Sequence, residues 1–273
     1  MESVIVARMI TTGGFKEVTY ICLFKKKTNV SNETIRYGAK LITVKDPKSV
    51  ISEQFRTIRT NISFMGIDHP IKTLAFTSAN ISEGKSTVTD NIAVVWANAG
   101  KRVLLIDADL RRPTLHQTFN ISNREGLTTI LTSDALEMDI TNMIKETEID
   151  NLSILTSGPI PPNPAELLNS QRMQALIASV EQSYDVVILD VPPILAVSDT
   201  QALVSHLDGV VLVVKMGQTE KAGLKRSVEL LKLAHANILG YVMNDVGRNG
   251  DSAYGYGYGY GYGYGYGYSS DNK

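Results

Sequence analysis

The sequence has one cysteine, almost no net charge and no long apolar run, and each of these shortages excludes a class of protein. A single cysteine, Cys22, cannot form an internal disulfide, so we expect a reducing, cytoplasmic compartment. The four histidines and the one thiol lack the spacing of a zinc site. A formal net charge of −1 offers no basic surface to a phosphate backbone, so no nucleic-acid partner is expected.

The apolar runs are too short for a membrane span. A spanning helix needs about 20 apolar residues, whereas the run at residues 18–24 is seven residues long and includes Thr19. The start of the chain also lacks the pattern of a secretory signal. We therefore expect that the chain does not cross a bilayer by itself, and we assign residues 1–42 to an N-terminal extension of undefined role.

From residue 71 onward, short apolar runs alternate with helical patterns, which is typical of a parallel sheet covered by helices on both faces. The runs are nearly continuous in Val, Leu and Ile, as expected for strands buried on both faces. The predicted strands are 71–77, 102–107, 152–156, 185–190, 209–215 and 238–244. The predicted helices are 49–65, 86–99, 164–183, 198–207 and 219–235. The expected fold class is α/β, with a mostly parallel sheet in one domain over residues 43–249.

Two of the predicted helices have features of their own. Asn163 as the cap and Pro164 as the first helical residue predict a sharp start for the helix at 164–183. The helix at 49–65 has a buried stripe at helical spacing, formed by Ile51, Phe55, Ile58, Ile62 and Met65. Its charged residues Glu53, Arg56 and Arg59 lie within an arc of about 120° on another side. Periodicity alone leaves two interpretations of that charged row, a solvated face or a contact between subunits.

Residues 79–87 follow a predicted buried strand and open a predicted helix, which is the context that a nucleotide-phosphate loop requires. Their sequence is Ala-Asn-Ile-Ser-Glu-Gly-Lys-Ser-Thr, in which Ala79 replaces the usual first glycine of the Walker A pattern. Backbone N–H groups and the helix N-terminus would hold the phosphates of ATP. The fold class is therefore expected to be P-loop NTPase-like.

Two side chains of this loop have expected roles of their own. Lys85 would reach the β- and γ-phosphate oxygens, and the hydroxyl of Ser86 would bind Mg²⁺. The remaining candidates for cofactor binding in the loop are Ser82, Glu83, Gly84 and Thr87.

Three aspartates stand at the ends of predicted strands. Asp107 and Asp109 follow one strand and Asp190 ends another, at the edge where ligands of open α/β sheets bind. Acids beside a triphosphate are reasonable only around Mg²⁺ or as a proton acceptor. Arg111 and Arg112 come next, and they would either hold phosphate or an acidic partner, or be solvated.

The C-terminal residues 250–273 contain a repeat in which tyrosine alternates with glycine. Glycine at every second position disfavours a packed strand, so we expect a flexible tail. Beside a phosphate loop, phosphorylation is the preferred interpretation, and a solvated tail without a role is the alternative. The candidate phosphoacceptors are Tyr254, Tyr256, Tyr258, Tyr260, Tyr262, Tyr264, Tyr266 and Tyr268.

Together these motifs resemble those of the bacterial tyrosine kinases, or BY-kinases, of capsule and exopolysaccharide systems. The resemblance runs from about Thr43 to the C-terminus. The matching pieces are Walker A at 79–87, the A′ motif at 107–113, Walker B ending at Asp190, the Glu-x-x-Arg-x-x-Arg pattern at 53–59, the proline-rich turn at 157–164 and the tyrosine cluster.

The resemblance implies ATP-dependent autophosphorylation of the tail in trans within a homo-oligomeric ring. In that case Lys85 binds phosphate, Ser86 and Asp107 bind Mg²⁺, and Asp190 supports the metal through water. Either Asp107 or Asp109 accepts the tyrosine proton, and these two alternatives stay open at this stage. The implied adenine contact is Asn244, and the implied subunit contacts are Glu53, Arg56 and Arg59.

The implied partners are a transmembrane activator of the polysaccharide co-polymerase type, which would recruit the chain to the inner face of the membrane, and a protein-tyrosine phosphatase. Two alternatives remain. A ParA- or MinD-type partitioning ATPase would carry a signature lysine five residues before the catalytic one, where this chain has Asn80. A non-catalytic adaptor would bind ATP without transferring phosphate.

Overall fold

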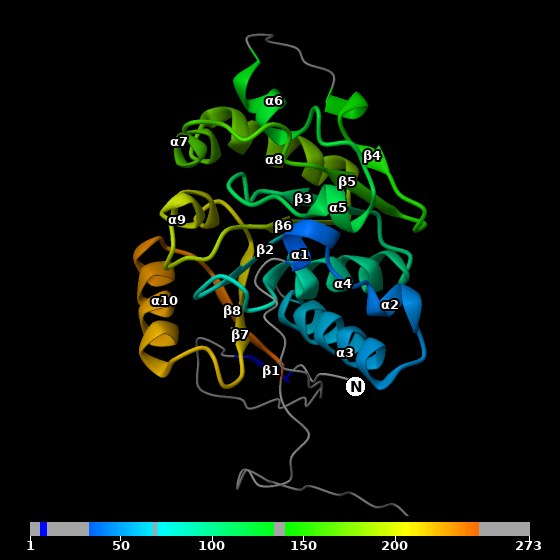
Figure 1. Ribbon diagram of the computed structural model, residues 1–273, viewed down its shortest axis with the longest axis vertical. Coiled ribbons are helices and arrows are strands. Elements are labelled where there is room, and N and C mark those ends of the chain that lie inside the picture. Colours follow the sequence, from blue (N-terminus) through cyan, green and yellow to red (C-terminus); the bar gives the residue numbers. More distant parts are fainter. Residues whose placement is uncertain (1–5, 10–32, 68–69, 134–139, 246–273) are drawn as a thin grey trace, which may run out of the picture.

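A sheet of eight strands crosses the computed structural model, which describes residues 6–9, 33–67, 70–133 and 140–245 (Figure 1). The strands are β1 Val6–Met9, β2 Thr73–Ser78, β3 Val103–Asp107, β4 Lys145–Glu146, β5 Leu152–Leu155, β6 Val186–Asp190, β7 Gly209–Lys215 and β8 Ile238–Asn244. The helices are α1 Glu33–Tyr37, α2 Ile42–Lys45, α3 Val50–Met65, α4 Lys85–Ala97, α5 Leu115–Thr118, α6 Leu127–Thr132, α7 Pro164–Leu168, α8 Gln171–Ser183, α9 Asp199–Val204 and α10 Lys221–Leu233, with a 3₁₀ turn at Ile140–Asn142.

The strand order is β1-β8-β7-β2-β6-β3-β5-β4. The six inner strands are parallel, and β1 and β4 are antiparallel strands at the two edges. The predicted mostly parallel α/β sheet is confirmed. Strands β7 and β8 begin and end at the predicted residues, and the other inner strands lie within two residues of theirs.

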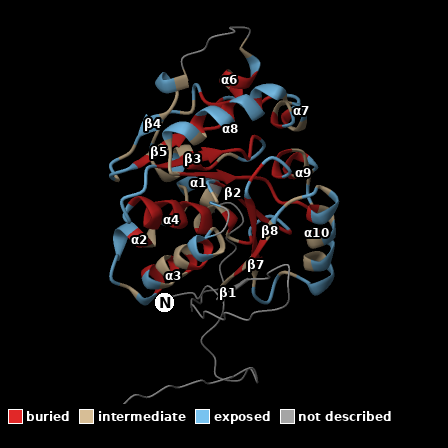
Figure 2. Ribbon diagram, turned by 180° about the vertical axis from the view of Figure 1, so that it is seen from behind, coloured by how far each residue is buried: buried red, intermediate tan, exposed pale blue. Residues whose placement is uncertain are grey.

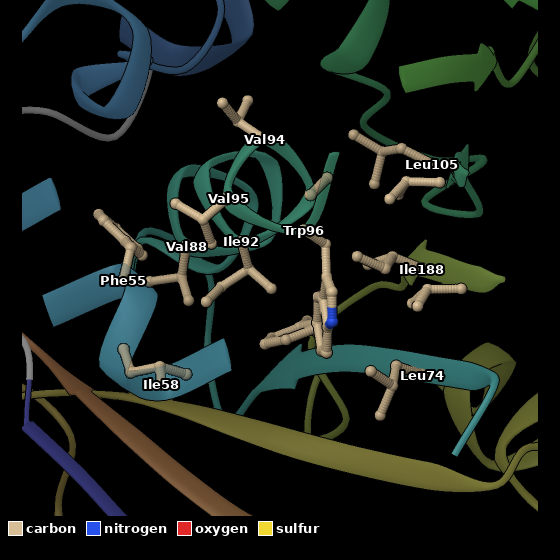
Figure 3. Close-up of a cluster of buried hydrophobic side chains, with 14 of the residues drawn as sticks. Phe55, Ile58, Leu74, Val88, Ile92, Val94, Val95, Trp96, Leu105 and Ile188 are labelled. Atoms are coloured by element: carbon tan, nitrogen blue, oxygen red, sulfur yellow. The ribbon is translucent and has the colours of Figure 1, made fainter. Parts of the chain in front are cut away.

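Helices pack on both faces of the sheet because successive strand residues point to opposite sides. In β2, Leu74 and Phe76 join the cluster under α3 and α4, while Ala75 joins the cluster under α8, α9 and α10. Figure 2 shows buried residues along the sheet and exposed residues on the outer sides of α8 and α10. Trp96 of α4 lies close to Leu74 in the first cluster (Figure 3).

Helix α3 buries the predicted stripe. Ile51, Phe55, Ile58 and Ile62 are each no more than 2% exposed, and Met65 packs partly buried against the same cluster. The helix begins after Ser49, whose hydroxyl accepts the backbone N–H of Ser52 at 3.2 Å. A capped start and a continuous apolar face together explain why this segment is helical.

The prediction of one helix over 164–183 is wrong, because α7 and α8 are separate helices. Helix α7 starts after Asn163 as expected, although the Asn163 side chain donates to Glu166 and caps no backbone N–H. Helix α8 has its own cap, Ser170, whose hydroxyl accepts the N–H of Met173 at 3.2 Å. The second cap interrupts an apolar pattern that is otherwise compatible with a single helix.

Part of the predicted N-terminal extension joins the main body of the protein. Strand β1 pairs with β8, and Leu41 and Ile42 pack against the cluster under α3 and α4. These contacts do not locate a domain boundary, so the boundary at residue 42 stays a prediction. Within the described ranges, no helix is both long enough and apolar enough to span a bilayer.

Candidate functional site

The site lies where the parallel strands end at a common edge of the sheet. Strand β2 stands between β7 and β6, so the loop at 79–84 leaves the middle of the sheet. Asp107 and Asp190 end β3 and β6 on one side of this loop. The ends of β7 and β8, at Lys215 and Asn244, lie on the other side. A ligand across this edge would therefore meet Asp107 and Asp190 on one side of the loop and the ion pair of Lys215 with Asp245 on the other.

The phosphate loop has the backbone that an anion site needs. Ser82 and Gly84 have positive φ values of 63° and 87°, so the chain turns tightly before α4. A Cβ atom at position 84 would lie 2.0 Å from the side-chain nitrogen of Asn244, which only glycine avoids. No side chain caps the first turn of α4, so its N–H groups remain free to bind phosphate.

Lys85 and Ser86 both contact Asp190 across the site. The Lys85 ammonium is 2.6 Å from one Asp190 carboxylate oxygen and 3.6 Å from Asp109. The Ser86 hydroxyl donates to the other Asp190 oxygen at 2.6 Å. Burial alone would lower the pKa of Lys85, but Asp190, Asp109 and Asp107 outweigh it and raise that pKa, so Lys85 is cationic.

Asp107 and Asp109 have different surroundings although one residue separates them. Asp107 is fully buried, and its Oδ2 accepts the N–H groups of Thr114 at 2.9 Å and Leu115 at 3.0 Å. Its Oδ1 has no hydrogen-bond partner among the described residues. Burial and the nearby Asp190 raise the pKa of Asp107 to about 8.

Asp109 is also buried, but less completely than Asp107. It is 6% exposed, its Oδ1 accepts the backbone N–H of Arg112 at 3.1 Å, and its Oδ2 faces Lys85. Burial raises the pKa of Asp109, while the positive charge of Lys85 opposes that rise. The structure thus separates one deep carboxyl group with an unpartnered oxygen from one nearer to solvent.

Comparison with known proteins identifies the group to which this chain belongs. A family model described as "AAA domain" matches residues 71–240. Tyrosine-protein kinase YwqD of Bacillus subtilis is 46% identical over 224 residues, which are 82% of this chain and 93% of that protein. The chain belongs to the bacterial tyrosine kinases. The predicted resemblance is confirmed, and neither the partitioning ATPase nor the adaptor is favoured.

Two solved structures share the fold of this kinase. The kinase domain of Escherichia coli tyrosine kinase ETK is 34% identical with a TM-score of 0.73, covering 80% of this chain and 85% of that one. The chimerical protein CapA2B2 is 37% identical with a TM-score of 0.72, covering 81% of this chain and all of that one. The P-loop NTPase-like fold class is confirmed.

The residues of the kinase fit Mg²⁺ together with phosphate. Among the described ranges, no three His, Cys, Asp or Glu side chains gather to hold a metal by themselves. Mg²⁺ in nucleotide sites commonly uses one or two carboxylates and completes its shell with phosphates and water. The unpartnered oxygen of Asp107, the hydroxyl of Ser86 and the carboxylate of Asp190 meet that requirement.

Arg111 has a partner that the sequence analysis missed. Its guanidinium binds Asp199 through two hydrogen bonds of 2.7 and 3.1 Å, and Asp199 is fully buried at the start of α9. The Arg111 guanidinium is therefore engaged with an acid of its own chain, although its side chain is 45% exposed. The pair ties the loop after β3 to the segment after β6, both of which carry acids of the site.

Asp90 is a second residue that the sequence analysis missed. It lies one helical turn after Ser86, is fully buried, and neither of its carboxyl oxygens has a hydrogen-bond partner among the described residues. Burial, followed by the charge of Asp190, raises the pKa of Asp90 well above its usual value. A lone acid in a stretch of α4 that is otherwise mostly apolar was the available signal.

The charged row on α3 makes contacts within the kinase itself. Arg56 binds Glu53 at 2.6 Å and the carbonyl of Pro47 at 2.5 Å. Arg59 donates to the carbonyl of Val95 at 3.2 Å, near the end of α4. A role of this row between subunits stays a prediction, and the eight candidate tyrosines lie outside the described residues.

The other predicted nucleotide-binding residues lie in the phosphate loop or beside it. The side-chain amide of Asn244 donates to the carbonyl of Glu83 at 3.0 Å, so it braces the phosphate loop. The Glu83 side chain is 1% exposed and points away from solvent, while Ser82 is exposed. The adenine contact of Asn244 and the phosphate contact of Thr87 stay predictions.

Proposed function

We propose that this kinase transfers the γ-phosphoryl group of ATP to tyrosines in the tail of another copy of the chain, and thereby regulates capsule or exopolysaccharide production. The main support is the arrangement of Lys85 and Ser86 opposite Asp107, Asp109 and Asp190 at one sheet edge. The Tyr-Gly repeat of the same chain supplies an acceptor, and close relatives are named tyrosine-protein kinases.

The strand order gives ATP one orientation. Its phosphates would lie on the loop at 79–87, with the terminal phosphate toward β6 and β3, where the acids end their strands. Its base would then lie toward the ends of β7 and β8, beside Asn244. In the opposite orientation, the terminal phosphate would have neither Lys85 as a partner nor an aspartate nearby to accept a proton.

The Mg²⁺ that accompanies ATP would be held by Ser86, Asp107 and, through water, Asp190. When bound, the ion neutralises negative charge on the phosphates as the leaving group forms. Lys85 exchanges its contact with Asp190 for phosphate oxygens, which releases that carboxylate. The unpartnered oxygen of Asp107 is already free to face the cation.

Asp109 accepts the phenolic proton in this scheme. The bond between the γ-phosphorus and the bridging oxygen breaks, ADP leaves with the electron pair, and a new bond joins phosphorus to the tyrosine oxygen. The proton of the phenol passes to Asp109, which is less completely buried than Asp107 and therefore nearer to a tyrosine that would arrive from solvent. Asp107 is deeper and anchored by two backbone N–H groups, which suits a metal ligand better than a base.

The tail has the reach and the charge for transfer between subunits. Fifteen residues, 254–268, extend at most about 50 Å, so they can enter a neighbouring site. Eight phosphates would add roughly −12 to −16 charges at neutral pH to a nearly neutral chain. This repulsion would separate a ring whose subunits meet through Glu53, Arg56 and Arg59. A transmembrane activator at the inner face of the membrane and a tyrosine phosphatase complete the cycle.

Intact-mass measurement after incubation with Mg·ATP tests the proposal. Mass increases in steps of one phosphate support a kinase, whereas phosphate release without a mass change would indicate a partitioning ATPase. No turnover of either kind would indicate an adaptor. Lys85→Met should abolish the increase. Lys72→Met should leave it unchanged, because Lys72 directly precedes β2, at the end of the strand opposite to the phosphate loop.

A tail variant tests the acceptor and the charge argument separately. Replacing all eight tyrosines by phenylalanine should remove the mass increase and leave a ring that Mg·ATP does not disperse in analytical ultracentrifugation. Normal dispersal of this variant would show that phosphate charge on the tail is not what separates the subunits.

A further inference from the structure

Glu83 belongs to the phosphate loop, yet its side chain joins the loop to a distant segment. Its Oε2 accepts the backbone N–H of Asn80 at 3.0 Å, and its Oε1 accepts the side-chain amide of Asn80 at 3.4 Å. Oε1 also accepts the hydroxyl of Thr219 at 2.6 Å, across 136 positions of sequence. At 1% exposure, the carboxyl group faces these donors and is closed to solvent.

Thr219 connects Glu83 to the end of β7. It lies just before α10, and its hydroxyl accepts the backbone N–H of Lys215, the last residue of β7, at 2.9 Å. The hydroxyl therefore donates to Glu83 while its position is fixed by the strand. Removing it would take away a hydrogen bond to a carboxyl oxygen and the link between the two segments.

The end of β8 reaches the same residue through its backbone. The amide of Asn244 donates to the Glu83 carbonyl at 3.0 Å, and the carbonyl of Asn244 accepts the N–H of Met216 at 2.8 Å. The ends of β7 and β8 are thus bound to each other and, at two points, to Glu83. These ends form the side of the site toward which the base of ATP points in the orientation proposed above.

We propose that Glu83 is a positioning residue that fixes the base side of the nucleotide site relative to the phosphate loop, so that base and phosphates bind cooperatively. This inference rests on the proposed function. When both halves are held at a fixed separation, a ligand that occupies one half meets the other half already ordered and loses less entropy on binding. A ligand without a base gains nothing from the connection.

Thr219→Val tests the connection, because valine keeps the branched shape and lacks the hydroxyl. Calorimetric titration of the full chain with ATP and with inorganic tripolyphosphate, both with Mg²⁺, separates the base from the phosphates. We expect ATP affinity to fall about tenfold, and tripolyphosphate affinity to change less than about twofold. Thr219→Ser keeps the hydroxyl and should restore ATP affinity.

Glu83→Gln should weaken ATP binding at least as much as Thr219→Val, because an amide nitrogen would face a donor. If the two residues act through one contact, the double variant should be no weaker than Glu83→Gln alone. Additive losses would mean that Thr219 and Glu83 act independently, which would overturn the proposal.

Thr73→Val is the matched control, because Thr73 is the first residue of β2, at the end of the strand opposite to the site. The Thr73 hydroxyl also donates to a carboxylate, Asp208 at 3.1 Å, and accepts a backbone N–H at 2.9 Å. This variant should bind ATP like the parent. Parent-like ATP binding by Thr219→Val, or equal losses of ATP and tripolyphosphate, would overturn the connection alone. A parent protein that binds neither ligand would overturn the proposed function as well.

Discussion

Replacing Asp107 by asparagine should stabilise the metal-free protein while abolishing phosphorylation. The folded protein keeps a proton on Asp107 up to a pKa of about 8, whereas the unfolded chain releases it near the usual value of 3.8. Stability therefore falls as pH rises through this window, by about 1.4 kcal/mol per unit. At pH 7, about 3 units above the unfolded value, the cost is at most about 4 kcal/mol.

Asparagine avoids this cost and keeps the contacts of the aspartate. Its oxygen can accept the N–H groups of Thr114 and Leu115, and its amide nitrogen would occupy the place of the unpartnered oxygen, facing carboxylates. We expect the stability gain over the parent to be near zero at pH 4 and to grow as pH rises to 8.

Urea unfolding in EDTA at several pH values measures the effect. Asp185→Asn is the control of opposite sign, because a backbone N–H of Arg102 lowers the pKa of that carboxylate. This variant should be less stable than the parent by a constant amount at every pH above 4, and the deficit should shrink only as pH falls below the usual value of 3.8. Mg·ADP should reduce the difference in the free energy of unfolding between the parent and Asp107→Asn, because the cation compensates the negative charge of the parent's buried carboxylate. If the difference in the free energy of unfolding between Asp107→Asn and the parent is the same at every pH, the burial cost assigned to Asp107 is refuted.

Two further changes probe pairs and caps. Arg111→Ala leaves the fully buried Asp199 without its partner, but the Arg111 side chain is 45% exposed, so the free energy of unfolding should fall by only about 2 kcal/mol. Loss of the more exposed Arg102 in Arg102→Ala should cost under about 1 kcal/mol. Equal losses would argue that the burial of Asp199 adds nothing to its pair. Ser170→Ala removes the cap of α8 and should lower the free energy of chemical unfolding by about 1 kcal/mol. Asn163→Ala should cost less, because the Asn163 side chain caps no backbone N–H. A larger loss for Asn163→Ala than for Ser170→Ala would contradict the break between the two helices.

The sheet was predictable because its signal is local. Strands buried on both faces have continuous apolar sequences, so β7 and β8 could be located to the residue. The phosphate loop was equally accessible, since its strand, turn and helix are contiguous at 73–97. Both features depend on neighbouring residues, which a single sequence displays.

Contacts between distant residues were not predictable. The pair Arg111–Asp199 and the bond from Thr219 to Glu83 depend on the strand order β7-β2-β6-β3, which no local pattern specifies. The Arg111 side chain was therefore left between phosphate, an acidic partner and solvent, and the structure gives it an acid of its own chain, Asp199. The break before α8 was missed for a different reason: the apolar pattern of 164–183 is compatible with one helix, and the cap preference of Ser170 was not weighed against it.

The edges of the sheet limit how copies of this protein can join. Strand β4 has two residues, both charged and exposed, and β1 runs against the direction of the six inner strands. A short, charged edge strand resists pairing with another sheet. Growth by strand addition into a fibre is thereby disfavoured at the β4 edge.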